Sequence, residues 1–138
     1  MRRLGKPMQR LESMENGKQT KPGLVHLLFA MRNTFAGIRT CFRREAAFRQ
    51  EVAIGVLNVA AAIALPIPWT MGFGMILLWL LLLAAELLNS SIEEVVDLVS
   101  PEWNEYAKRA KDYASAAVFC LFVVFFGAWS AIVVVLIF

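Results

Sequence analysis

Three long apolar runs dominate the sequence after residue 51 and decide which solvent the chain can fold in. They extend over Val52 to Leu65, Met71 to Leu88 and Tyr113 to Phe138. Hydrophobic residues make up 59% of the 138 residues, more than a soluble domain of this length can bury. A helix needs about 20 such residues to cross the hydrocarbon of a bilayer. We therefore predict an all-α membrane protein with transmembrane helices at about 48–67, 71–90 and 113–136.

Two segments of different character precede these runs. Residues 1–22 are polar and mixed in charge, so we expect a disordered tail followed by one membrane domain over 23–138. No apolar stretch precedes Leu24, which argues against a cleaved signal peptide. Over 24–44 apolar residues recur every three or four positions and arginines lie off that stripe. This pattern predicts an amphipathic helix at the membrane surface, while a core helix of a soluble domain is the alternative.

The distribution of charge predicts how the helices cross the membrane. All but three of the 14 Lys and Arg residues precede Val52, and those three lie between the second and third runs. By the positive-inside rule, the N-terminus and that connection are cytoplasmic and the C-terminus is outside. The candidate anchors at the membrane interfaces are Trp69, Trp79, Trp103 and Trp129, although Trp79 falls in the middle of the second apolar run and need not be one. We interpret Cys41 and Cys120 as free thiols.

Polar side chains form a stripe at the end of the second apolar run. Glu86, Asn89, Glu93 and Asp97 are spaced by 3, 4 and 4 residues, which places them on one face of a helix. A carboxylate in the hydrocarbon costs about 2.5 kcal/mol or more, so its presence indicates a function. Carboxylate oxygens are ligands that Mg²⁺ prefers. An interhelical hydrogen bond for Glu86 and a solvated helix end for the others are the structural alternatives.

Two further polar clusters lie at the same predicted membrane face. One lies at the entrance to the first span and includes Glu45, Arg49 and Glu51, and the other lies at the entrance to the third span and includes Lys111 and Asp112. Taken alone, the first cluster predicts only a surface ion pair between Glu45 and Arg49. The second predicts only the basic residues that the positive-inside rule places on the cytoplasmic side. Together with the stripe, they favour phosphoryl transfer from a water-borne donor to a membrane-embedded acceptor. The sequence has no GxxxxGK[ST] loop, and its single histidine has no partner for zinc.

Three motifs carry a resemblance to a known family. They are EAAFRQE at 45–51, ELLNSSIEEVVD at 86–97 and AKDYASAA at 110–117. The chain resembles the small prokaryotic diacylglycerol kinases from about Leu24 to its C-terminus. The resemblance implies a homotrimer in the bacterial inner membrane, with sites between subunits that use ATP and Mg²⁺ to convert diacylglycerol to phosphatidate. No nucleic-acid partner is expected.

The resemblance also implies a role for each matching residue. Glu86 would be the general base with Asn89 beside it, and Glu45 and Glu93 would hold Mg²⁺ with the nucleotide. The remaining assignments are Glu102, Lys111 and Asp112 to the nucleotide, Ala47, Phe48, Arg49, Gln50, Glu51 and Ser115, together with Glu86, to the lipid, and Asp97 to support of the site.

Two residues differ from the family pattern, and two alternative functions are compatible with part of the sequence. His26 and Asn33 stand where well-known members of the family have an arginine and a tyrosine near the nucleotide. An undecaprenol kinase would use the same site on a polyprenyl alcohol, although EAAFRQE favours the diacylglycerol branch. A non-catalytic channel or transporter subunit would explain Glu86 through cation conduction, but it gives no role to Glu45, Glu93, Lys111 and Asp112 together.

Overall fold

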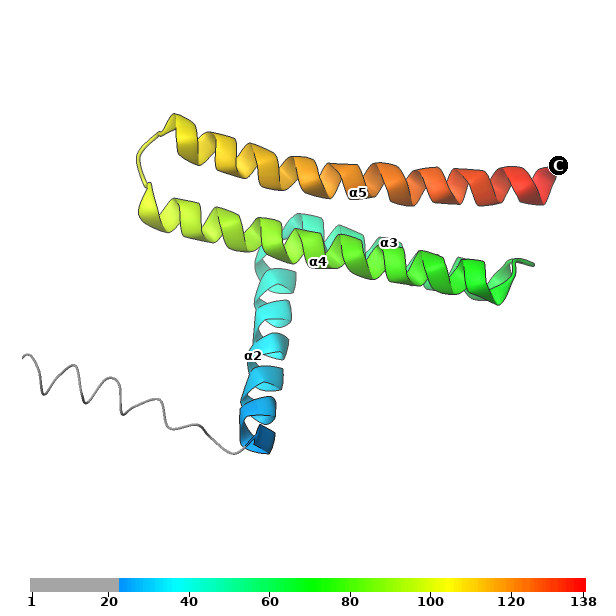
Figure 1. Cartoon of the computed structure of the whole chain (residues 1–138), viewed down its shortest axis with the longest axis horizontal. Coiled ribbons are helices and arrows are strands. Elements are labelled where there is room, and N and C mark those ends of the chain that lie inside the picture. The colour runs from blue at the N-terminus through cyan, green and yellow to red at the C-terminus, as the bar shows by residue number, and fades with distance from the viewer. Residues whose placement is uncertain (1–22) are drawn as a thin grey trace, which may run out of the picture. The chain divides into compact units, whose positions relative to one another are not determined.

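The computed structural model describes residues 23–138, and the predicted tail at 1–22 lies outside the described residues. The described part is helical and has no strand. Its helices are α2 (Gly23–Arg44), α3 (Ala46–Ala64), α4 (Trp69–Val99) and α5 (Glu105–Ile137), which Figure 1 labels. The chain forms two compact units, divided within α2 after Gly37. The all-α prediction is confirmed.

The first unit contains the part of α2 that ends at Gly37. Large apolar side chains of this segment are exposed, among them Leu27, Leu28 and Phe35. Thr34 turns its hydroxyl back to the helix and donates to the Ala30 carbonyl oxygen at 3.0 Å. This part of the helix therefore carries large exposed apolar side chains.

The second unit is a bundle of α3, α4 and α5, in which α4 contacts both other helices and neighbouring helices run in opposite directions (Figure 1). Each of the three is long and apolar enough to cross a membrane, so the prediction of three such helices is confirmed. Few apolar side chains are buried between them, notably Met75, Leu82 and Phe125. Most large apolar side chains face outward, as expected where the surrounding solvent is lipid.

The helix ends explain how polar groups reach one end of this bundle. The α4 helix has 31 residues and α5 has 33, more than the hydrocarbon requires. Because α4 extends to Val99, the stripe from Glu86 to Asp97 lies on one uninterrupted helix. Asn104 caps α5, because its side-chain oxygen accepts from the backbone N–H groups of Tyr106 at 2.8 Å and Ala107 at 3.3 Å.

The junction between α2 and α3 is closed by Arg49. Its guanidinium donates to the carbonyl oxygens of Phe42 and Arg43, both at 3.3 Å. These carbonyls end α2 and have no partner within the helix. None of the ion pairs within residues 23–138 joins Glu45 to Arg49, so the surface pair considered from the sequence does not form. Arg49 instead stabilises the interruption between helices α2 and α3 at Glu45.

A buried asparagine connects the three helices of the bundle. Asn58 in α3 is 3% exposed, and its Nδ2 donates to the carbonyl oxygen of Met75 in α4 at 3.3 Å. Its Oδ1 accepts from Nε1 of Trp129 in α5 at 3.0 Å. Trp129, a candidate interface anchor, thus directs its N–H to Asn58. The network satisfies polar groups that would otherwise be unpaired in an apolar bundle.

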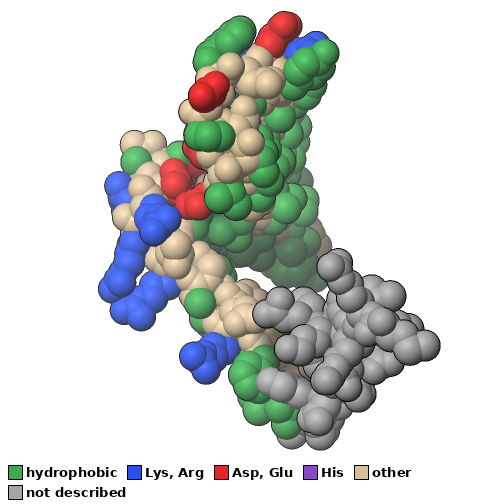
Figure 2. Space-filling view, turned by 90° about the vertical axis from the view of Figure 1, so that its left-hand side faces the viewer, with side chains coloured by type: hydrophobic (Ala, Val, Ile, Leu, Met, Phe, Trp, Pro, Cys, Tyr) green, Lys and Arg blue, Asp and Glu red, His purple; other side chains and the backbone are tan. Residues whose placement is uncertain are grey.

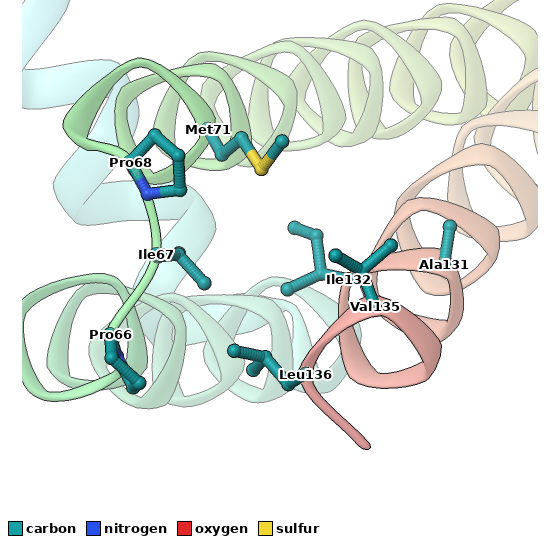
Figure 3. A pocket seen from close by; sticks show the side chains of 8 residues that line it. All are labelled: Pro66, Ile67, Pro68, Met71, Ala131, Ile132, Val135 and Leu136. Carbon is teal, nitrogen blue, oxygen red and sulfur yellow. The ribbon is translucent and has the colours of Figure 1, made fainter. Parts of the chain in front are cut away.

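An apolar cavity of about 340 Å³ lies where the α3–α4 connection meets the last turns of α5 (Figure 3). Its lining is Pro66, Ile67, Pro68, Met71, Ala131, Ile132, Val135 and Leu136. None of these side chains can donate a hydrogen bond, hold a cation or exchange a proton. We therefore assign no catalytic role to this apolar cavity.

Candidate functional site

A second cavity, of about 300 Å³, lies among α3, α4 and α5 and has a polar lining. The residues around it are Ala47, Gln50, Glu51, Ile54, Glu86, Asn89, Ser115, Val118, Phe119 and Phe122. These lining residues include both residues predicted to be catalytic, Glu86 and Asn89, and four others predicted to contact the lipid. Each of the three sequence motifs contributes at least one residue. We call this space the acceptor cavity.

Two carboxyl groups face the acceptor cavity although they are shielded from water. Glu86 is 5% exposed and Glu51 is 1% exposed. Neither oxygen of the Glu51 carboxyl has a hydrogen-bond partner within residues 23–138, and the same is true of Asn89 Oδ1. Buried polar groups are nearly always paired, and exceptions call for an explanation. A ligand with its own hydroxyl or other donors would supply the missing partners.

The other wall of the acceptor cavity is apolar and was not predicted. Ile54 lies one turn after Glu51 in α3, and Val118, Phe119 and Phe122 follow Ser115 in α5. Spacings of three and four residues from the polar members would have identified Ile54, Val118 and Phe119, and Phe122 lies two turns from Ser115. The cavity therefore combines hydrogen-bonding groups with a surface for hydrocarbon.

Asn89 links the acceptor cavity to the charged end of α4. Its Nδ2 donates to Oε1 of Glu93 at 3.3 Å, one turn further along the helix. The amide therefore orients Glu93, while its own oxygen is buried without a partner among the described residues and Asn89 itself lines the cavity. This hydrogen bond joins the two middle members of the polar stripe.

Charged groups of α4 and α5 form ion pairs beyond Glu93. Lys111 donates from Nζ to Oδ1 of Asp97 at 2.5 Å, which joins the two helices. Lys108 and Asp112 form an i,i+4 pair at 2.6 Å. Figure 2 looks at the end of the bundle with the α4–α5 connection and shows acidic side chains among largely apolar helix surfaces. Lysine side chains of this kind can bind phosphate groups.

Several predicted site residues lie away from the acceptor cavity. Phe48 is 2% exposed and belongs to the core, Arg49 closes the α2–α3 junction, and Glu45 occupies that junction. Glu102 is in the α4–α5 connection, where its carbonyl oxygen accepts from the Ser100 hydroxyl at 3.2 Å. Within 23–138 no three His, Cys, Asp or Glu side chains gather as a metal-binding group.

Cys41 occupies a separate position at the end of α2. Its Sγ lies 3.7 Å from Oγ of Ser90, so a weak hydrogen bond joins α2 to α4. Burial raises the pKa of the thiol, the hydrogen bond from Ser90 lowers it, and the carboxylate of Glu45 raises it. The net pKa is higher than that of a free cysteine. Cys41 and Cys120 are both free, as predicted.

The acceptor cavity has the features expected of a site for an amphiphilic alcohol. Its buried carboxyl groups can accept a proton or a hydrogen bond from a hydroxyl. Its apolar side can contact hydrocarbon, and the paired charges beyond Asn89 can meet an ionic co-substrate. The arrangement is suited to chemistry at the boundary between lipid and water.

Comparison with known proteins gives the relationship directly. The sequence model described as prokaryotic diacylglycerol kinase matches residues 32–133. The diacylglycerol kinase of Pseudomonas aeruginosa is 42% identical over 110 residues, covering 80% of this chain and 89% of that protein. Those of Haemophilus influenzae and Escherichia coli strain K12 are 35% identical over 116 residues and 36% identical over 107. The matches cover 80% and 78% of this chain and 93% and 88% of those proteins. This membrane protein therefore belongs to the prokaryotic diacylglycerol kinase family.

Proposed function

We propose that this chain transfers the terminal phosphoryl group of ATP to the free hydroxyl of diacylglycerol, which yields phosphatidate and ADP. The name shared by its relatives supports the kinase activity and the lipid substrate. The observation that carries the proposal is the acceptor cavity, in which Glu86, Glu51, Asn89 and Ser115 meet beside an apolar wall. A glyceride alcohol has a matching division between polar backbone and acyl chains.

Glu86 is the general base of the proposed reaction. Its carboxylate accepts the proton of the lipid hydroxyl while that oxygen forms a bond to phosphorus and the bond from phosphorus to the departing ADP oxygen breaks. General bases contribute about 10²- to 10⁴-fold to a rate. Its near-complete burial keeps water from competing for the phosphoryl group. Asn89 donates a hydrogen bond to Glu93 and lines the same cavity.

The charged end of α4 and α5 binds the nucleotide in this proposal. Glu45 and Glu93 would hold Mg²⁺, and their carboxylate oxygens suit this hard cation. When bound, Mg²⁺ neutralises phosphate charge during the transfer. Lys111, Asp112 and Glu102 contact the nucleotide, and the ion pair with Asp97 directs Lys111.

The working assembly is a homotrimer with sites between subunits. This is the assembly that the resemblance to the prokaryotic diacylglycerol kinases implies. Residues 23–138 form the catalytic domain, and 1–22 lie outside it. The exposed apolar side chains of α2 support its placement along the membrane surface.

The charge distribution supports one orientation in the bacterial inner membrane. The N-terminus and the α4–α5 connection lie in the cytoplasm, where ATP is available, and the C-terminus lies outside. The acceptor cavity then opens where a lipid hydroxyl and a soluble nucleotide can meet.

The test is lipid phosphorylation by purified protein in mixed micelles, with labelled ATP and Mg²⁺. Diacylglycerol and undecaprenol are supplied separately, and Glu105→Gln serves as a control because that carboxylate is exposed at the start of α5. We expect labelled phosphatidate from wild type and control. A strong preference for undecaprenol would change the assigned substrate from diacylglycerol to undecaprenol, since an apolar wall can also contact a polyprenyl chain. No phosphorylated lipid from either alcohol would contradict the kinase proposal and favour a non-catalytic membrane subunit.

A further inference from the structure

An indole group in α4 contacts the backbone of the turn that carries Glu51. Nε1 of Trp79 donates to the Glu51 carbonyl oxygen at 3.0 Å. Trp79 precedes Glu86 by seven residues, which places both on nearly the same face of α4 two turns apart. Leu82 lies on this face between them and is fully buried. The bond therefore joins the α4 face that presents Glu86 to the α3 turn that presents Glu51.

The contact is possible because residue 55 is a glycine. A Cβ added to Gly55 would overlap three atoms of the Trp79 indole. No glycine described in the structure has a positive φ, so residue 55 is needed for space and not for an unusual backbone conformation. Gly55 stands one turn after Glu51, at the position whose N–H binds the Glu51 carbonyl in a regular helix. The indole thus fills the place of a side chain and reaches the same carbonyl.

This contact fixes one wall of the acceptor cavity relative to the other. Gln50, Glu51 and Ile54 line the cavity from the α3 turn that Trp79 holds, and Glu86 lines it from α4. An unsupported Glu51 carboxyl would shift with that turn, since its oxygens have no hydrogen-bond partner within residues 23–138. Trp79 itself does not line the cavity.

From this we infer that Trp79, seated on Gly55, is a positioning residue that sets the lipid-binding side of the site. The inference rests on the proposed function, because it assigns the acceptor cavity to diacylglycerol. It predicts that loss of the indole N–H weakens lipid binding and leaves nucleotide binding intact, since the paired charges of Lys111 and Asp97 lie on other turns.

The experiment compares Trp79→Phe with wild type in mixed micelles, with KM for diacylglycerol, KM for ATP and kcat measured separately. We expect KM for diacylglycerol to rise roughly three- to tenfold, the effect of one interhelical hydrogen bond in a membrane. KM for ATP and kcat at saturating lipid should change less than twofold. Trp69→Phe is the matched control, because that indole is 79% exposed.

A second pair of variants tests the contact itself. Gly55→Ala should lower the midpoint of thermal unfolding and raise KM for diacylglycerol, because the indole has to move. Gly74→Ala should change neither, since a Cβ at that position meets no atom within 4 Å. In a Trp79→Leu background, Gly55→Ala should cause little further change, because the overlapping indole is gone.

Each result separates the inference from the proposed function. If wild type phosphorylates diacylglycerol and Trp79→Phe leaves KM for the lipid unchanged, Trp79 only packs two helices and the inference is wrong. An equal rise in both KM values would also overturn it. A wild type with no activity on diacylglycerol would contradict the proposed function, and the inference would fall with it.

Discussion

Replacing Trp129 with phenylalanine tests how the buried network holds the three spans together. The change removes the only donor that the structure gives Asn58 Oδ1 within residues 23–138, at a position that is 3% exposed. Interhelical hydrogen bonds in membrane proteins contribute about 0.6 kcal/mol on average and about 1.7 kcal/mol at most. Because the amide oxygen would be left buried and unpaired, we expect a loss near the upper value, about 1.5 kcal/mol.

The assay is reversible unfolding in mixed micelles, followed by tryptophan-independent far-UV circular dichroism. A loss of this size would lower the midpoint of thermal unfolding by roughly 3–10 °C. Asn58→Leu removes the other partner, and Asn58→Leu combined with Trp129→Phe leaves no unpaired side-chain group at this contact. The double variant should therefore lose less stability than the two single variants summed, by about 1 kcal/mol.

Two outcomes would refute this reasoning. Strictly additive losses would mean that Asn58 and Trp129 do not interact. A loss equal to that of Trp69→Phe, whose indole is 79% exposed, would mean that the hydrogen bond contributes nothing. KM for both substrates should stay unchanged, because neither Asn58 nor Trp129 lines the acceptor cavity or forms a hydrogen bond with a residue that lines it.

Three further predictions concern the charged groups and the thiol. Glu93→Gln should raise the Mg²⁺ concentration for half-maximal rate about tenfold or more, and an unchanged Mg²⁺ titration would contradict its role as a ligand. Lys111→Met should raise KM for ATP about tenfold or more and leave KM for diacylglycerol unchanged, as steady-state kinetics will show. The raised pKa of Cys41 keeps its thiol protonated to higher pH, so alkylation by iodoacetamide at pH 8 should be slower than for free cysteine and should increase with pH. Ser90→Ala should slow it further, because the hydrogen bond from Ser90 lowers that pKa; mass spectrometry of the modified peptide gives the rate.

The helices and the polar stripe could be predicted because they depend on local spacing. Apolar runs of sufficient length indicate three spans whatever their tertiary contacts. Glu86, Asn89 and Glu93 share a face of α4 because of helical periodicity alone, and the hydrogen bond between Asn89 and Glu93 follows from their i,i+4 spacing. The motifs also identified Glu51 and Ser115, which the fold brings into the same cavity.

Contacts between helices could not be obtained from spacing. Arg49 has an acidic residue one turn before it, yet its guanidinium binds the free carbonyls at the end of α2. Trp129 resembles an interface anchor in sequence, but a buried amide from another helix binds its N–H. The fit of Trp79 over Gly55 joins positions 24 residues apart, and only the packing of α3 on α4 reveals it.

The most direct test of the central claim is the turnover of Glu86→Gln on diacylglycerol, with both substrates saturating and binding of each measured separately. This substitution keeps the size of the side chain and removes its ability to accept the hydroxyl proton. We predict a fall in kcat of roughly 10²-fold or more, with KM for ATP and the midpoint of thermal unfolding close to those of wild type. A Glu86→Gln protein that forms phosphatidate at the wild-type rate would contradict the assignment of the acceptor cavity as the site of phosphoryl transfer.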